Sequence, residues 1–127
     1  MHAAKKRLLL VDDEKDITSV LHTALEESGF EVVSFNEPLL ALQHFKAHHY
    51  DLVILDIKMP EMNGFELYRQ IRRKDKRVRV CFLTAVSEFG EYEQYKKEAY
   101  PKIGERYFVA KPASNKELIR RINEMLT

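Results

Sequence analysis

Two stretches, Arg7-Leu8-Leu9-Leu10-Val11-Asp12-Asp13 and Leu52-Val53-Ile54-Leu55-Asp56, each place aspartate directly after an apolar run. Short apolar runs of this kind are typical of buried β-strands. A carboxylate at the end of a buried strand is costly unless another group compensates its charge. If both runs lie side by side in one sheet, three carboxylates converge at its carboxyl edge, and such a cluster favours a bound cation.

The rest of the chain alternates apolar runs with longer segments of helical period. The apolar runs predict five strands, at 7–11, 31–35, 52–55, 79–83 and 107–110. Strict alternation of strand and helix predicts a doubly wound α/β domain, with a five-stranded parallel sheet in the order 2-1-3-4-5. The run 31–35 mixes polar and apolar residues, as an edge strand does.

Four helices are predicted from apolar stripes at three- and four-residue spacing. Their stripes are Ile17, Val20, Leu21, Ala24 and Leu25; Leu39, Leu42 and Phe45; Phe65, Leu67, Tyr68 and Ile71; and Leu118, Ile119, Ile122, Met125 and Leu126. We expect Gly29 to cap the first helix at its C-terminus, Asn63-Gly64 to form a turn before the third, and Ser114 to cap the last at its N-terminus.

The composition suits one soluble domain, since 45% of the 127 residues are apolar and 32% are charged. A net charge of +1 gives no field that favours nucleic acid or an anionic membrane, so we expect a protein partner. The apolar run 8–11 is too short for a secretion signal or a membrane span, which predicts a cytoplasmic protein. The single cysteine, Cys81, lies in an apolar run and is expected to be a buried thiol.

Two further strands are expected to bring polar residues to the same edge of the sheet. The strand at 79–83 leads into Thr84, and the strand at 107–110 leads into Lys111-Pro112. In a doubly wound sheet the ligand site lies beyond the carboxyl ends of the strands, at the switch point between strands 1 and 3. A strand-terminal Asp or Thr often only caps a helix, and a Lys before Pro is usually solvated. Together, these residues predict a phosphoryl-transfer site.

With these motifs in place, the chain resembles the receiver domain of two-component response regulators. The matching residues are the pair Asp12-Asp13, the segment from Asp56 to Gly64, the Thr84-Ala85 step and Lys111-Pro112. The resemblance covers the whole chain and implies a flavodoxin-like (βα)5 domain over residues 1–127, with about 1–6 as a flexible lead. It is closest in kind to stand-alone, chemotaxis-type receivers, although a receiver cut from a longer protein fits the sequence equally well.

By that resemblance, Asp56 is a phosphoacceptor that takes a phosphoryl group from a histidine of a kinase or phosphotransfer protein. Asp13, Asp56 and the backbone carbonyl of Lys58 would bind Mg²⁺ or Mn²⁺, and Asp12 would act mainly through a water on the ion. Lys111 and Thr84 would contact the phosphoryl oxygens. The protein would assist its own phosphorylation without being a turnover enzyme.

The resemblance also implies a conformational switch. Thr84 would move toward the phosphoryl group and Phe108 would rotate into the space that it leaves, altering the face formed by residues 86–110. That segment departs most from the family pattern, because residues 87–100 are charged and rich in tyrosine. We expect an unknown downstream protein to bind this face, with Tyr95 and Tyr100 as candidate contacts.

Three alternatives use the same residues. A haloacid-dehalogenase-type phosphatase needs a second aspartate two positions after its nucleophile, where this chain has Lys58. A flavin-binding flavodoxin needs a hydroxyl- and glycine-rich loop after strand 1, where this chain has Asp12-Asp13-Glu14. A pseudo-receiver, which binds partners without being phosphorylated, stays open as the alternative to the phosphoacceptor.

Overall fold

The computed structural model describes residues 5–85, 108–111 and 114–127. Its strands are β1 (Arg7–Val11), β2 (Glu31–Phe35), β3 (Leu52–Asp56), β4 (Arg79–Ala85) and β5 (Phe108–Lys111). Its helices are α1 (Lys15–Glu27), α2 (Pro38–His44), α3 (Gly64–Lys74) and α5 (Asn115–Leu126). The side chains of Thr84, Phe108 and Lys111 lie outside the description, as do residues 86–107, on which the predicted output face falls.

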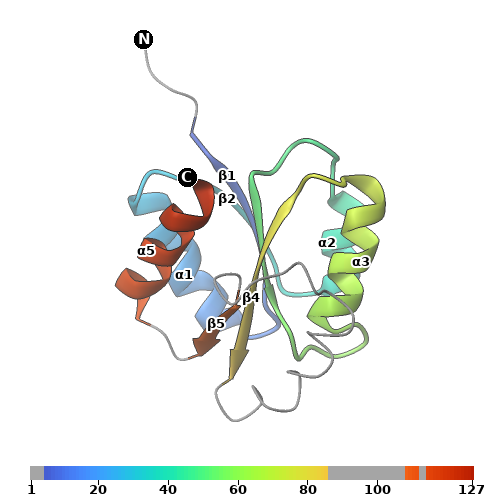
Figure 1. The fold of residues 1–127 in the computed structure, drawn as a ribbon. Coiled ribbons are helices and arrows are strands. Elements are labelled where there is room, and N and C mark those ends of the chain that lie inside the picture. The colour runs from blue at the N-terminus through green and yellow to red at the C-terminus, as the bar shows by residue number, and fades with distance from the viewer. Residues whose placement is uncertain (1–4, 86–107, 112–113) are drawn as a thin grey trace.

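The described strands pair in parallel, in the order β2-β1-β3-β4-β5. Helices α1 and α5 cover one face of the sheet, and α2 and α3 cover the other (Figure 1). Such a sheet buries β1 and β3 on both faces, which explains their unbroken apolar sequences. The α/β class and the parallel sheet are confirmed, and β2 lies at an edge as predicted.

The core consists of two clusters, one on each face of the sheet. One contains alternate residues of β1 and β3 packed with Phe65, Leu67 and Ile71 of α3. The other contains the remaining strand residues packed with α1 and α5. Cys81 belongs to this second cluster and is fully buried, as predicted. Burial raises the pKa of its thiol to about 12.

Two of the four predicted helical stripes are partly wrong. On α1, Ile17 and Val20 are exposed, and the hydroxyl-bearing Thr18 takes an inward position beside Leu21 and Leu25. On α2, Leu39 is exposed, whereas Pro38 and Ala41 face the core. A helix with apolar residues on several sides gives an ambiguous stripe, so its rotation depends on what it packs against. The stripes of α3 and α5 are confirmed.

The structure contains the residues that were predicted to end or begin three of the helices. Gly29 follows α1 with φ +97°, a conformation that favours glycine. Asn63 and Ser114 are the N-caps of α3 and α5, and their side chains accept hydrogen bonds from the amides of Glu66 and Glu117. The strands differ from the prediction by only a few residues: β3 includes Asp56, and β4 runs on to Ala85.

No helix in the described part of the chain is both long and apolar enough to cross a membrane. The cytoplasmic location stays a prediction.

Candidate functional site

Asp12 is fixed where β1 ends. Its backbone amide donates to the carbonyl of Phe35 on β2, at 3.2 Å. Its carbonyl accepts hydrogen bonds from Thr18 Oγ1, at 3.0 Å, and from Asn36 Nδ2, at 2.9 Å. One carboxylate oxygen accepts from the amide of Glu14, at 3.0 Å. The side chain is fully buried, so these contacts hold a carboxylate inside the protein at the carboxyl edge of the sheet.

Asp56 is the last residue of β3, and the strand register brings it to the same place. Val11 pairs with Leu55, so the residues that follow them lie next to one another. Asp56 in turn pairs with Leu83 of β4. Its side chain is only 5% exposed. The predicted convergence of β1 and β3 is therefore present in the structure.

Four carboxylates gather at this point. Each of Asp12, Asp13, Glu14 and Asp56 offers an oxygen, and these oxygens all lie within 4.8 Å of one another. Unit negative charges at such distances repel one another strongly where the site is partly dry. Carboxylate oxygen is also the donor that Mg²⁺ prefers. The residues present thus fit a hard divalent cation, which would offset the repulsion of the buried pair, Asp12 and Asp56.

The loop after Asp56 is held against the sheet by backbone contacts. The amide of Ile57 donates to the carbonyl of Leu83, at 3.0 Å, and the amide of Gly64 donates to the carbonyl of Ile57, at 2.8 Å. A Cβ on Gly64 would lie 2.4 Å from the backbone oxygen of Asp56. Glycine at this position allows α3 to start directly beside the aspartate. Within the same loop, Glu61 has a positive φ of 71°.

The backbone register also carries Thr84 and Lys111 to this edge. Thr84 follows Leu83, the β4 partner of Asp56, and pairs with Ala110 of β5. Lys111 pairs with Ala85, one residue further along both strands. Their strand positions match the prediction, while the placement of their side chains lies outside the described part of the chain.

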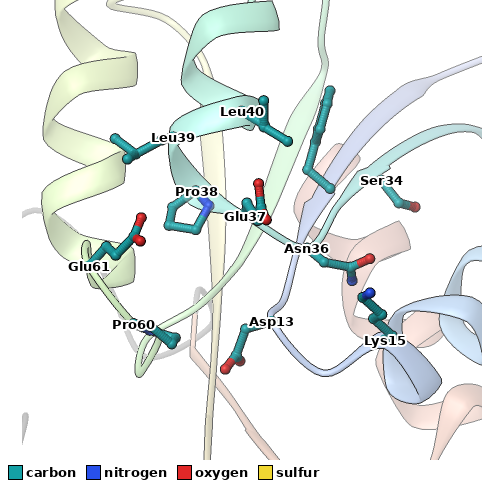
Figure 2. Close-up of a pocket in the computed structure, with 11 residues that line it drawn as sticks. Asp13, Lys15, Ser34, Asn36, Glu37, Pro38, Leu39, Leu40, Pro60 and Glu61 are labelled. Carbon is teal, nitrogen blue, oxygen red and sulfur yellow. The ribbon is translucent and has the colours of Figure 1, made fainter.

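An open cavity of about 760 Å³ adjoins the acidic cluster. Figure 2 shows Asp13, Lys15 and Asn36 along one side of it and Pro60 and Glu61 along the other. The start of α2, with the exposed Leu39 and Leu40, forms the remaining wall. Asp13 itself is partly exposed. The cavity therefore leaves the cluster accessible from solvent on this side.

The sequence profile described as "Response regulator receiver domain" matches residues 8–123 of this chain. The chain belongs to the response regulator receiver domain family. Receiver domains are the signalling switches of two-component systems, and the acidic cluster of this one lies at the edge of the sheet where its motifs predicted it.

The receiver domain has curated relatives that are about twice its length. It is 39% identical over 120 residues to the transcriptional regulatory protein CpxR homolog of Haemophilus influenzae. This match covers 94% of this chain and 50% of that protein. It is 34% identical over 126 residues to the probable transcriptional regulator ycf27 of Cyanophora paradoxa. This match covers 99% of this chain and 50% of that protein. The chain thus spans about half the length of the curated relatives that it matches.

Solved structures resemble the receiver domain over nearly its whole length. The non-phosphorylated HemR receiver domain of Leptospira biflexa matches with a TM-score of 0.82 and 29% identity, covering 97% of this chain and 95% of that one. The response regulator TrrA of Thermotoga maritima, solved in complex with Mg²⁺ and BeF, matches with a TM-score of 0.75 and 32% identity, covering 95% of this chain and 99% of that one.

Three polar residues of this receiver domain contribute to the site beyond the predicted set. Glu14 directly follows the acidic pair and adds a carboxylate to the cluster, although the prediction did not include it among the site residues. Thr18 and Asn36 orient the backbone of Asp12, and Asn36 Nδ2 also donates to Thr18 Oγ1, at 2.9 Å. Only the strand register brings Asn36, which follows β2, to this position. For Thr18, the sequence offered one indication of a role in the site, namely a hydroxyl group on the buried side of α1.

Proposed function

We propose that this receiver domain is a phosphoacceptor switch in which Asp56 accepts a phosphoryl group. The observation that carries the proposal is the position of Asp56, at the end of a buried strand, with three further carboxylates gathered around it. A structural role alone gives no reason to concentrate four like charges at one point. A site for a cation and a phosphoryl group does give one, because both reactants need fixed charges around them.

The transfer itself requires little covalent help from the protein. A carboxylate of ordinary acidity carries no proton at neutral pH, so it can attack phosphorus without a separate base. With phosphohistidine as donor, an oxygen of Asp56 forms the new P–O bond as the P–N bond breaks, and the released imidazole takes up a proton. We propose a histidine kinase or a phosphotransfer protein as the donor, in keeping with the family.

Asp13, Asp56 and the backbone carbonyl of Lys58 are the proposed ligands of Mg²⁺ or Mn²⁺, with Asp12 supporting them. The bound ion would neutralise charge and orient the phosphoryl oxygens. The structure of TrrA with Mg²⁺ and BeF supports the pairing of such an ion with a phosphoryl-like group on a related fold. Lys111 would contribute a further positive charge, as a compact ammonium.

Thr84 and Phe108 are the proposed switch residues, and the face over 86–110 is the proposed binding surface for a downstream protein. Phosphorylation would favour one of two packings of this face, as ligands shift the populations of pre-existing states. We also propose that residues 1–127 form a single (βα)5 domain.

Acetyl phosphate provides a direct test, because it needs no partner protein. The wild-type chain should gain one phosphoryl group in the presence of Mg²⁺, seen by intact mass, and should gain none when Mg²⁺ is removed with EDTA. Asp56→Asn should gain none under either condition. Asp16→Asn is the matched control, since Asp16 is an exposed aspartate in the first turn of α1.

A phosphoryl adduct on Asp56→Asn would contradict the assignment of the acceptor. If no donor phosphorylates the wild-type chain, the result favours the pseudo-receiver. Small-molecule and histidine donors should both be tried before that conclusion, and circular dichroism should confirm that each variant is folded.

A further inference from the structure

The positive charges of the chain are not spread evenly over its surface. Six exposed basic residues lie at the ends of α2 and α3 or just after them, and we call them the basic ridge: Lys46, Arg72, Arg73, Lys74, Lys76 and Arg77. The acidic cluster lies at the opposite end of the sheet, beyond the strand carboxyl ends (Figure 1). A net charge of +1 thus conceals a basic end and an acidic end.

The one acidic residue within the segment 72–79 does not neutralise the ridge. Asp75 is 3% exposed and turned inward. Its carboxylate accepts hydrogen bonds from the backbone amides of His48, at 2.9 Å, and Arg77, at 3.0 Å. The neighbouring Lys74 donates to the carbonyl of Leu42, at 3.1 Å. These contacts tie the loop after α2 to the loop after α3, so the ridge is one surface formed by two fixed segments.

In the part of the chain that the structure describes, no carboxylate forms an ion pair with a cation of the ridge. Within the residues that the structure describes, Lys46, Arg73, Lys76 and Arg77 form no ion pair, and Arg72 instead donates to the hydroxyl of Tyr68, at 2.8 Å. Elsewhere on the surface, guanidinium groups do find partners, as in the pairs Arg7–Glu31 and Arg120–Glu124. The ridge therefore presents unneutralised charge that a polyanion can use.

The chemistry of the ridge selects among polyanions. The exposed large hydrophobic residues of the described chain are Ile17, Val20, Val33, Leu39 and Leu40, none of them in the ridge. A lipid surface therefore finds no apolar group to insert. Unpaired bases likewise find no exposed aromatic ring on the ridge, because Tyr68 is buried beneath Arg72. Guanidinium and ammonium groups without stacking partners fit the regularly spaced phosphates of a duplex.

We infer that the basic ridge binds the phosphate backbone of double-stranded nucleic acid, without reading its sequence. The contact needs neither Asp56 nor a phosphoryl group, and it leaves the acidic cluster facing away from the nucleic acid. The inference is therefore independent of the proposed switch.

The test is fluorescence anisotropy of the full 127-residue chain with a labelled duplex DNA of random sequence, at several salt concentrations. The logarithm of the binding constant should fall linearly with that of the salt concentration, by about 0.9 for each phosphate neutralised. Four to six contacts predict a slope between about −3.5 and −5.5. Arg73→Ala/Arg77→Ala should reduce the slope by about 1.8 and weaken binding at low salt at least about tenfold.

The matched control is Lys116→Ala/Arg120→Ala, which removes the same charge from α5, on the other face of the sheet. This control should bind the duplex as the wild type does. Circular dichroism and urea unfolding check the fold of each variant. If the double ridge variant is unstable, Lys46→Gln and Lys76→Gln test the two segments separately, each with an expected slope change of about 0.9.

Duplex binding that is unchanged in the ridge variants, or that both double variants weaken equally, would overturn the inference. So would tighter binding to a single strand of equal length, to phosphatidylserine vesicles or to poly-glutamate than to the duplex. Those outcomes would assign the ridge to an unpaired strand, a membrane or an acidic protein.

Discussion

Gly64 determines how closely α3 approaches Asp56. The atoms that crowd its missing Cβ are all backbone: the oxygen of Asp56 at 2.4 Å, the Cα of Ile57 at 3.0 Å and the carbonyl carbon of Asp56 at 3.1 Å. Backbone atoms cannot rotate away as the end of a side chain can. Any side chain at position 64 must therefore displace either α3 or the end of β3.

We expect Gly64→Ala to lower the free energy of unfolding by about 1–3 kcal/mol, the usual effect of overpacking, and to slow phosphorylation by acetyl phosphate. Urea unfolding and intact mass measure the two effects. Gly29→Ala is the control, because no atom lies within 4 Å of its Cβ position and only the positive φ causes strain. It should cost roughly 1–2 kcal/mol and leave phosphorylation unchanged. Wild-type stability and phosphorylation in Gly64→Ala would contradict this account.

Thr18 supports the backbone of Asp12 from within α1. Its hydroxyl is positioned to donate to the carbonyls of Asp12, at 3.0 Å, and Glu14, at 2.9 Å, and the residue is 5% exposed. Thr18→Val keeps the shape and removes the hydrogen bonds, which should cost about 1–3 kcal/mol of stability and weaken Mg²⁺ binding in a calorimetric titration. Thr23→Val, an exposed site on the same helix, should change stability by less than about 0.5 kcal/mol. Equal effects of the two changes would refute the supporting role.

Helix α3 has Asn63 as its N-cap and Asp75 as its C-cap, and the Asp75 carboxyl group responds to pH. Burial acts to raise the pKa of the Asp75 carboxyl group, but hydrogen bonds from the amides of His48, Arg77 and Val78, with the charge of His48, hold this pKa below its ordinary value. A lowered pKa means that the folded state binds the proton less well than the unfolded state does. The stabilisation is then complete above the unfolded pKa, near 4, and is lost as the pH falls through the folded value.

We expect Asp75→Asn to lower the free energy of unfolding by about 1–3 kcal/mol at pH 7, because one amide loses its acceptor in a buried place. The difference between wild type and Asp75→Asn should shrink as the pH falls below about 4. Urea unfolding at several pH values measures it. The exposed Asp16→Asn serves as the control. A difference in unfolding free energy between wild type and Asp75→Asn that grows toward low pH would contradict the expectation.

The fold of the whole molecule shields the Cys81 thiol from solvent, since it lies in the core between the sheet and the helices α1 and α5. Its pKa of about 12 leaves almost no thiolate at neutral pH, and its burial excludes reagents. We expect iodoacetamide to modify Cys81 only through unfolding, so that urea accelerates the reaction in parallel with the unfolding transition. Ser28→Cys adds an exposed thiol as a control, which should react at once in the folded protein. Rapid modification of the folded wild type would show that the core opens locally.

Much of this architecture follows from local patterns. Buried strands need unbroken apolar runs, so β1 and β3 were evident, and caps such as Ser114 and Asn63 use side-chain bonds to nearby amides. The stripes of α1 and α2 were less certain, because Ile17, Val20 and Leu39 are apolar yet exposed. Which side of such a helix faces inward depends on the sheet that it covers.

Residue type and spacing alone predicted the acidic motif and the strand order, because a β-α alternation brings strand-terminal carboxylates to one edge of the sheet. The family was indicated by the resemblance of these motifs to receiver domains and is shown by the match over residues 8–123. Three features depended on contacts between segments distant in the sequence. Asn36 reaches Asp12 only through the register of β1 and β2, and Gly64 meets Asp56 only because α3 folds back on β3. The basic ridge arises because Asp75 turns inward while its neighbours face solvent. Net charge is a sum over the chain, whereas the direction in which each charge points is set by packing.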